Sequence, residues 1–308
     1  MNTERIAIVS KTTCILGIGL IGGSLALSLR NKGFARQIIG VDSSKEHRNL
    51  ALLHGLVDQI LELDQAIDQS DVILLCAPVS VNSRLLPHIL DRVKGTSKVV
   101  ADMGSTKADI IGTVKNHPLR GRYVAVHPMA GTEYSGPLAA KDKLFDNKLA
   151  IICDSQNSDE DAMNLISGML TTLGMGISLM NSAEHDIHVA YVSHLSHISS
   201  FALALSVLDK EKDEKNILSL AAGGFESTVR LAKSNSATWA PIFLQNAKPL
   251  LEVIDNYIEK VMLFRQYIMM NDPDSLLDLM KEANKIEKIL DQNKHKSTTT
   301  AYIVSPLN

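Results

Sequence analysis

The chain has 308 residues, which is enough for two domains, and hydrophobic residues make up 45% of it, as in an ordinary soluble globular protein. Its net charge of −3 gives no basis for binding nucleic acid or an anionic membrane surface. Length, composition and charge therefore favour an ordinary soluble globular protein with two domains or one large one.

Sorting signals and cysteine usage favour the cytoplasm. The first residues do not form the apolar segment of a secretory signal, and no apolar run approaches the roughly 20 residues that span a bilayer. The three cysteines, Cys14, Cys76 and Cys153, lie in apolar strand-like runs without paired spacing, which is typical of reduced, buried thiols.

The first predicted element is a strand that runs into a glycine-rich turn. An apolar run over 14–16 precedes Gly17-Ile18-Gly19-Leu20-Ile21-Gly22-Gly23-Ser24, and a helical pattern follows from Leu25. Glycines in such a turn let backbone N–H groups approach a pyrophosphate, and the helix N-terminus supplies partial positive charge. A second strand over 37–41 ends at Asp42, 20 residues after Gly22, where a carboxylate can accept hydrogen bonds from an adenosine ribose. This context favours a dinucleotide site over a plain glycine turn.

Asp42 also predicts which dinucleotide is bound. Its carboxylate would repel the 2′-phosphate of NADP, and Ser43-Ser44 supplies no arginine directly after it. Lys45 and Arg48 are close enough in sequence to weaken this repulsion. The sequence therefore favours NAD over NADP as the cofactor.

Strand and helix signals alternate through the rest of the first half. After a helix over 45–54, further strands are predicted over 71–78, 97–102, 123–126 and 149–153. This alternation predicts an α/β fold with a doubly wound parallel sheet, whose ligands bind at the carboxyl ends of the strands. Those ends carry Gly17, Asp42, Pro78, Asp102 and His127, so one crevice could hold them all. The opening run Ile6–Val9 is either an extra strand or a tail.

From Ser182 onward the pattern is almost wholly helical. Helices are predicted over 183–208, with Ser182 as the N-cap, and over 215–231, 239–270 and 274–290. Long apolar helices of this kind suggest a core shared between subunits. We therefore divide the chain into a dinucleotide-binding domain over 1–181, a helical substrate and dimerisation domain over 182–294, and a polar tail over 295–308.

Two side chains at the predicted crevice could carry proton chemistry. His127 follows a strand and is fixed by Pro128, and its ordinary pKa near 6.5 suits a general base at neutral pH. Ser105 follows the strand over 97–102 and could hydrogen-bond a catalytic group or cap the next helix. Taken alone, such a histidine is more often structural than catalytic, but the place of His127 in a dinucleotide crevice favours a catalytic role.

Polar residues in the helical half suggest an anionic substrate. His185 and His188 are expected to share one helix face, and His194 and His197 another, so the pairs point apart. Without a companion cysteine or a zinc spacing they predict no metal site, although at least one could bind substrate. Arg230 lies in a small-residue, apolar segment and is either a carboxylate clamp or a surface ion pair. Trp239, the only tryptophan, could line the pocket or fill the core.

Together these motifs resemble the prephenate/arogenate dehydrogenase family of tyrosine biosynthesis. The resemblance covers roughly residues 12–290 and rests on five segments in order. They are the glycine turn, Asp102-Met103-Gly104-Ser105-Thr106-Lys107, His127-Pro128-Met129-Ala130-Gly131-Thr132-Glu133, Ser193-His194-Leu195-Ser196-His197, and Gly223-Gly224-Phe225 to Arg230 with Trp239 after it. The glycine turn is generic, whereas the His127 motif with the later histidine pair is more specific.

The resemblance implies a Rossmann domain followed by an all-helical dimerisation domain, and a cytoplasmic homodimer that binds neither nucleic acid nor membrane. It implies oxidative decarboxylation of prephenate to 4-hydroxyphenylpyruvate, or of arogenate to tyrosine, with NAD. By this resemblance His127 is the catalytic histidine and Ser105 positions it. The implied substrate-binding residues are Arg230, His197, Glu133, Trp239 and His185, and the implied cofactor-binding residues are Gly17, Gly19, Leu20, Ile21, Gly22, Asp42, Ala77, Pro78 and Ser105.

The sequence departs from the family pattern at three points. Ser196 stands where many members have proline, and Glu226-Ser227 stand where many have a basic residue followed by Asp. The chain also ends soon after the helical domain, so we expect no tyrosine feedback through a separate regulatory domain. Two other readings remain open: a β-hydroxyacid dehydrogenase, for which Lys210, Lys212 and Lys215 would be candidate bases, and a non-catalytic NAD-sensing protein.

Overall fold

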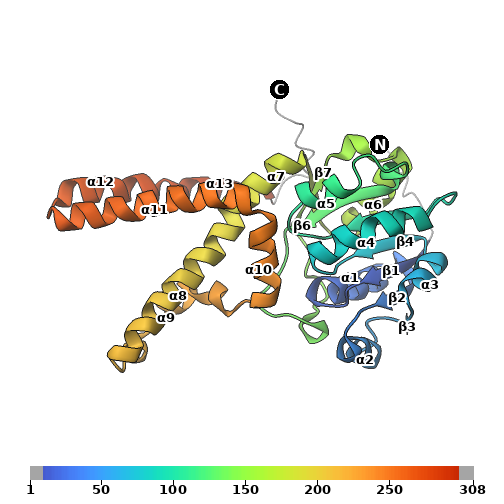
Figure 1. Ribbon diagram of the computed structural model, residues 1–308, viewed down its shortest axis with the longest axis horizontal. Helices are drawn as coiled ribbons and strands as arrows, with labels where there is room; N and C mark the ends of the chain where they lie inside the picture. Colours follow the sequence, from blue (N-terminus) through green and yellow to red (C-terminus); the bar gives the residue numbers. More distant parts are fainter. Residues whose placement is uncertain (1–9, 298–308) are drawn as a thin grey trace.

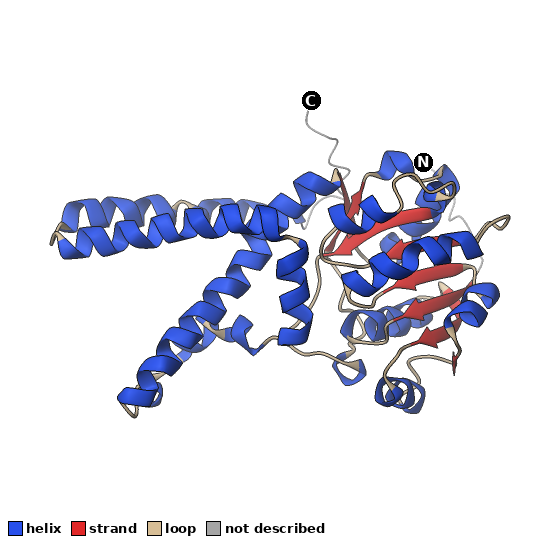
Figure 2. Ribbon diagram, viewed as in Figure 1, coloured by secondary structure: helices blue, strands red, loops and turns tan. Residues whose placement is uncertain are grey.

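The computed structural model describes residues 10–297, and its first part is a single eight-stranded sheet covered by helices on both faces (Figures 1 and 2). The order across the sheet is β3-β2-β1-β4-β5-β6-β7-β8. The strands are β1 Lys11–Leu16, β2 Ala35–Val41, β3 Gln59–Ile60, β4 Val72–Leu75, β5 Val99–Asp102, β6 Tyr123–Pro128, β7 Leu149–Cys153 and β8 Gly176–Met180. The run Ile6–Val9 and the end of the expected polar tail, residues 298–308, lie outside the described residues.

The first six strands are parallel, with the order 3-2-1-4-5-6 that is typical of dinucleotide-binding folds. Strand β7 pairs antiparallel with β6, and β8 pairs parallel with β7. The predicted strands are confirmed, but β3 and β8 were missed, as was the reversal at β7. A two-residue strand has no readable pattern, and the burial pattern of a strand carries no information about its direction.

Each face of the sheet has its own apolar core. Helices α1 Leu20–Asn31, α2 Lys45–Leu53 and α6 Glu160–Thr172 pack on one face through Leu25, Ala51 and Ile166. Helices α3 Leu63–Gln69, α4 Val79–Arg92 and α5 Ala108–Thr113 pack on the other through Ile67 and residues of α4 and α5. With both faces covered, ligands can reach the sheet only at the ends of its strands.

The second part is helical and leaves the sheet as two diverging limbs, with α10 near their base (Figure 1). One limb is built on α8, with α9 beside it, and the other on α11, α12 and α13. The elements are α7 Ser182–Val189, the π-helical segment η4 Ala190–His194, α8 Leu195–Asp213, η5 Leu218–Leu220, α9 Gly223–Thr228, η6 Arg230–Lys233, α10 Ser236–Gln245, α11 Ala247–Met269, α12 Pro273–Asn284 and α13 Ile286–Ser297.

Several details of the predicted helices were wrong. The N-cap of α7 is Asn181, whose side chain accepts a hydrogen bond from the Glu184 N–H at 2.8 Å, rather than Ser182. The stretch 215–231 is divided into the short helices η5, α9 and η6, and Asn216 ahead of them has a left-handed backbone with φ +80°. The stretch 239–270 is interrupted at Asn246, and α13 continues to Ser297, into the segment expected to be tail.

The continuous helix Ser182–Asp213 corrects a further expectation, because by length and composition alone it could cross a bilayer. The same helix carries His185, Asp186 and His194, which are buried against other parts of the protein. Ionisable groups of this kind are costly in lipid. We therefore attribute its remaining apolar surface to contacts with protein.

Candidate active site

The glycine turn between β1 and α1 brings the backbone close to its neighbours and leaves open space at the helix N-terminus. Gly17 has φ +91°, and a Cβ there would lie 2.5 Å from the Ala77 backbone nitrogen. A Cβ on Gly22 would collide with the Gly17 carbonyl oxygen. At Gly19, the N-cap of α1, a Cβ would meet no atom within 4 Å. The tight turn and the open helix start fit the pyrophosphate of a dinucleotide.

Asp42 follows β2 and fixes the shape of this turn. One carboxylate oxygen accepts the Ile18 N–H and the other accepts the Ser44 N–H, both at 2.8 Å. The guanidinium of Arg48 donates to the Asp42 backbone carbonyl at 2.9 Å. The His47 Nδ1 lies 3.4 Å from one of the two carboxylate oxygens. A carboxylate has about four lone-pair sites, so it can still accept a ribose hydroxyl. Asp42 thus holds the glycine turn and still presents negative charge where the ribose would lie.

Beneath the predicted crevice, β5 ends in a buried ion pair. Lys107 and Asp102 are fully buried and joined to each other, and the Lys107 Nζ also donates to the Val126 carbonyl at 2.8 Å. The Tyr123 hydroxyl donates to the same Asp102 carboxylate at 2.6 Å. This pair ties the end of β5 to β6 directly below His127. Ser105, between β5 and α5, is half-buried, and its hydroxyl makes no hydrogen bond within residues 10–297.

His127 lies in β6, one residue before its end, and contacts the helical half of the chain. Its Nδ1 lies 2.8 Å from Nε2 of His185, which is on α7. The Nδ1 of His185 in turn lies 2.8 Å from the Asp186 carboxylate. Burial holds the pKa of His127 well below its usual range, with smaller effects from His185 and Lys107. The imidazole is therefore neutral at neutral pH and available as a base.

His194, at the end of the π-helical segment, is buried nearby. Its Nδ1 lies 3.1 Å from the Asn246 Nδ2, which also donates to the Asp186 backbone carbonyl at 2.7 Å. Burial lowers the pKa of His194 to about 4. Since Nδ1 accepts from the amide, the proton of this neutral histidine is on Nε2. π-Helical turns often occur at functional sites, and this one sets the direction of His194.

An aromatic wall adjoins these histidines. Trp239 on α10 stacks on His197, with ring centroids 3.4 Å apart and planes at 24°. It also lies edge-on to His194 at 6.0 Å. The Nδ1 of His197 donates to the Ser193 carbonyl at 3.0 Å. Burial lowers the pKa of His197, and the positive charge of Arg230 lowers it further. Trp239 therefore lies against two histidines and not in a separate core.

Arg230, in η6, meets the loop that follows β6. Its guanidinium lies 3.5 Å from the Glu133 carboxylate, and about half of the Arg230 side chain is exposed. Asn235 lies 3.3 Å from the Ser135 hydroxyl a short distance along the same loop. These contacts place a cation and an anion together where the helical half faces the sheet.

The structure thus brings together His127 with His185, His197 with Trp239, and Arg230 with Glu133. It does not join Ser105 to His127 through a hydrogen bond. The sequence reasoning missed Asp186 and Asn246, and it did not single out His194. An Asp beside a helical His, and an Asn that interrupts a long helix, are weak signals because both residue types are common on helix surfaces. His185 and His188 do not share an environment, since His188 is exposed.

The lowered pKa of His194 predicts an acid-sensitive fold. The unfolded chain takes up this proton below about pH 6.5, whereas the folded chain does so only near pH 4, so acid favours unfolding between these values. Lowering the pH from 7 to 5 should therefore decrease the free energy of unfolding by about 2 kcal/mol through the titration of His194. Urea unfolding at both pH values should show a smaller loss in His194→Gln, whereas His188→Gln, at an exposed position, should behave as wild type. If His194→Gln lost as much of the free energy of unfolding between pH 7 and pH 5 as the wild type, the acid sensitivity would not come from His194.

Comparison with known proteins agrees with this architecture. The family model described as "Prephenate dehydrogenase, nucleotide-binding domain" matches residues 25–179, and "Prephenate dehydrogenase, dimerization domain" matches residues 181–282. The chain is 30% identical to prephenate dehydrogenase of Bacillus subtilis over 274 residues, covering 88% of this chain and 74% of that protein. It is 31% identical to cyclohexadienyl dehydrogenase of Zymomonas mobilis over 279 residues, covering 90% and 95%.

A solved structure is also similar over nearly its whole length. Prephenate dehydrogenase from Aquifex aeolicus, in complex with hydroxyphenyl propionate and NAD+, superposes with a TM-score of 0.81 at 28% sequence identity. The match covers 92% of this chain and 99% of that one. The likeness therefore includes both the sheet and the helical part.

Proposed function

Because the chain belongs to the prephenate dehydrogenase family, and is therefore an NAD-dependent oxidoreductase, we propose that it converts prephenate to 4-hydroxyphenylpyruvate in tyrosine biosynthesis. The observation that carries this proposal is the neutral His127, held by His185 at the edge of the sheet that also bears the glycine turn. A non-catalytic NAD sensor has no use for such a base. Mixing the protein with NAD and prephenate should produce NADH absorbance, and no signal with either prephenate or arogenate would overturn the proposal.

The bound cofactor supplies the hydride acceptor, and the glycine turn with Asp42 would hold it. His127 accepts the proton of the substrate ring hydroxyl as the carbonyl forms. The bond to the ring carboxylate then breaks, carbon dioxide leaves, and its electron pair makes the ring aromatic as a phenolate. His127 can return its proton to that oxygen, so the reaction releases no net proton. The residues therefore need to hold one proton and position the reactants.

The substrate would lie between the sheet edge and the helical half. Arg230 would bind a carboxylate through its planar guanidinium, and Trp239 with His197 would form the wall of the ring pocket. His194 would donate a hydrogen bond from Nε2. Ser105, whose hydroxyl is free of protein partners in residues 10–297, would approach the reacting hydroxyl together with His127.

One observation favours arogenate as a second candidate substrate. Glu133 lies beside Arg230, so this subsite offers an anion and a cation together. The side chain of arogenate carries an ammonium and a carboxylate, which would pair with them. Prephenate has a keto group where arogenate has an ammonium, and only the ammonium would pair with Glu133. Initial rates of Glu133→Gln should then show a raised KM for arogenate and an unchanged KM for prephenate. Equal effects on both substrates would remove this candidate role of Glu133.

We expect NAD to be preferred over NADP because Asp42 presents its charge at the ribose position. In Asp42→Asn, one oxygen still accepts a backbone N–H, but the charge that repels a 2′-phosphate is gone. With Arg48 adjacent, the ratio of kcat/KM for NAD over NADP should fall about tenfold, equivalent to about 1.4 kcal/mol. Initial rates with both cofactors measure the ratio. A wild-type preference for NADP, or an unchanged ratio in the variant, would contradict the role of Asp42.

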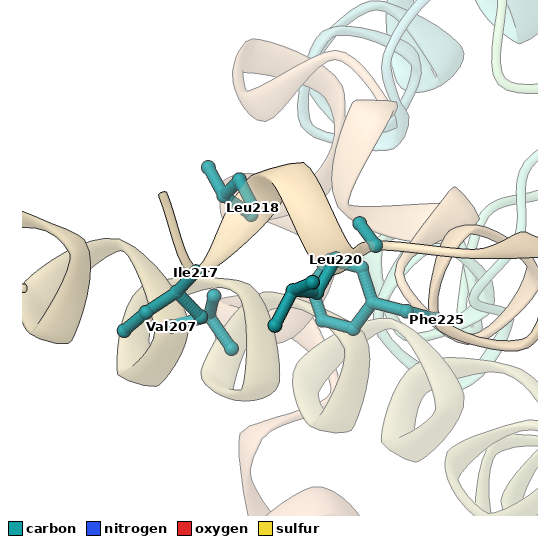
Figure 3. Close-up of a pocket in the computed structure, with 6 residues that line it drawn as sticks. Val207, Ile217, Leu218, Leu220 and Phe225 are labelled. Atoms are coloured by element: carbon teal, nitrogen blue, oxygen red, sulfur yellow. The ribbon is translucent and has the colours of Figure 1, made fainter. Parts of the chain in front are cut away.

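A homodimer is supported by the surface of the two helical limbs. Only His197 and Ser200 are buried on α8, and only Leu250 and Val253 on α11. Large apolar side chains on these limbs are exposed, among them Leu205, Leu208, Tyr257, Ile258, Val261, Met262, Ile268 and Met269. Figure 3 shows an apolar pocket of about 220 Å³ on the α8 limb, lined by Val207, Ile217, Leu218, Leu220, Ala221 and Phe225. Contiguous exposed apolar surfaces mark protein contacts.

Light scattering during gel filtration should give twice the chain mass of 33.6 kDa. Met262→Glu, which places a charge on the exposed face of α11, should shift the protein toward the monomer. A monomeric wild type would overturn the dimer. We further propose a cytoplasmic location, which the three free cysteines support.

A further inference from the structure

Asp186 is a buried carboxylate whose hydrogen bonds leave it one way to bind the neighbouring imidazole. Its Oδ1 accepts the Lys107 N–H and its Oδ2 accepts the Ala108 N–H, each at 2.8 Å. Backbone N–H groups only donate, so the carboxylate is an acceptor at both oxygens. Only 4% of Asp186 is exposed, so its carboxylate has little contact with water. The Nδ1 of His185, 2.8 Å from Oδ1, must therefore carry a proton and donate it.

This bond fixes the protonation of the next ring. With a single proton, on Nδ1, His185 has a lone pair on Nε2, which lies 2.8 Å from Nδ1 of His127. A hydrogen bond there requires the His127 proton to be on Nδ1. The lone pair of His127 is then on Nε2, the nitrogen that makes no hydrogen bond to protein in residues 10–297. A chain of two hydrogen bonds thus decides which nitrogen of His127 is basic.

The chain also bears on the charge that His127 acquires. When Nε2 accepts a proton, the imidazolium lies close to the Lys107 ammonium, which donates to the backbone carbonyl of Val126. That ammonium is already paired with Asp102. Asp186 is the carboxylate connected to His127 by hydrogen bonds, and His185 is the group between them. The negative charge of Asp186 therefore stabilises the protonated base without moving the Nδ1 proton.

We propose that His185 and Asp186 are positioning residues that hold His127 in its Nδ1–H tautomer and stabilise its protonated form during turnover. The proposal rests on the proposed function of His127 as the base. The proton taken from the substrate hydroxyl binds Nε2 and is later returned to the phenolate oxygen, while the protons on Nδ1 of His127 and Nδ1 of His185 stay in place. No other reactant is required.

The decisive variant is Asp186→Asn. An amide oxygen at the position of Oδ1 can still accept the Lys107 N–H and the His185 Nδ1–H, whereas the amide nitrogen replaces the Oδ2 that accepts the Ala108 N–H. The variant therefore removes the negative charge that stabilises protonated His127. We expect kcat to fall by about 10²–10⁴-fold, as when a buried carboxylate behind a catalytic histidine is neutralised, with KM changed by less than about threefold. Nitrogen-15 NMR of histidine-labelled protein should place the His127 proton on Nδ1 in the wild type.

A matched control separates this role from the structural one. Asp154 also clamps the start of the helical half, accepting the Ser182 N–H at 3.0 Å and the Ser182 hydroxyl at 2.8 Å, but within the described residues it makes no hydrogen bond or ion pair with a histidine. Asp154→Asn should lower the Tm yet leave kcat and the His127 tautomer unchanged. A wild-type proton on Nε2 of His127, or a kcat within about threefold of wild type in Asp186→Asn, would overturn the proposal. If neither substrate is turned over, the proposed function fails, while the NMR result still decides the tautomer.

Discussion

His127→Asn is expected to lower kcat by about 10²–10⁴-fold while leaving KM for substrate and NAD within about threefold of wild type. Asparagine retains an amide near the position of Nδ1 and can still hydrogen-bond His185, so the local packing should survive. It has no basic nitrogen to accept the proton of the substrate hydroxyl. The loss should therefore appear in the chemical step and not in binding.

The neutral state of His127 makes this prediction specific. Burial holds the pKa of His127 well below its usual range, so the ring is a ready acceptor across the neutral pH range. His188→Asn, at an exposed position on the same helix as His185, is the matched control and should retain wild-type kcat. Turnover of His127→Asn within tenfold of wild type, with an intact Tm, would mean that another group accepts the proton.

The parts of the site that lie close together in sequence could be predicted from it. The glycine turn, Asp42 and the strand ends form a local pattern, because the carboxyl ends of successive parallel strands meet at one edge. The same reasoning placed His127 at that edge. The reversal at β7 escaped prediction, since a buried apolar run reads the same in either direction.

The parts of the site that depend on distant contacts could not be predicted. His127 and His185 are 58 residues apart, and Asn246 lies 52 residues from His194. Nothing in either local pattern indicates which nitrogen bonds to which partner. The π-helical segment also escaped prediction, because one extra residue in a turn leaves the apolar periodicity almost intact. The regular spacing therefore predicted a uniform α-helix, whereas the π-helical segment changes the direction of His194 relative to His185.

The helical half shows the same limit for a different reason. The long apolar helices were recognised, but their apolar faces are mostly exposed in the single chain. Periodicity identifies an apolar face without saying whether the chain itself or a second copy covers it. The expectation of a shared core came from the length and apolar character of these helices, and the exposed faces of α8 and α11 support it.

Arg230→Ala is expected to raise the KM for prephenate about 10–100-fold with little change in kcat, because a charge-assisted hydrogen bond to a carboxylate contributes about 1.5–3 kcal/mol. In this structure the guanidinium lies 3.5 Å from the Glu133 carboxylate, and this long contact of a half-exposed arginine contributes little by itself. A substrate carboxylate offers a closer and planar partner. Arg230→Lys should recover only part of the affinity, since an ammonium lacks the two-pronged geometry.

Lys233 supplies the control for this prediction. It lies in the same short helix as Arg230, and its ammonium pairs with Glu226 at 3.2 Å rather than with the loop that carries Glu133. Lys233→Ala removes a positive charge from the same region without removing the proposed clamp, so its KM should stay within about twofold of wild type. Equal increases in both variants would indicate general electrostatic attraction of the substrate. An unchanged KM in Arg230→Ala would place the substrate carboxylate elsewhere, because a bound carboxylate cannot lose a bidentate partner without cost.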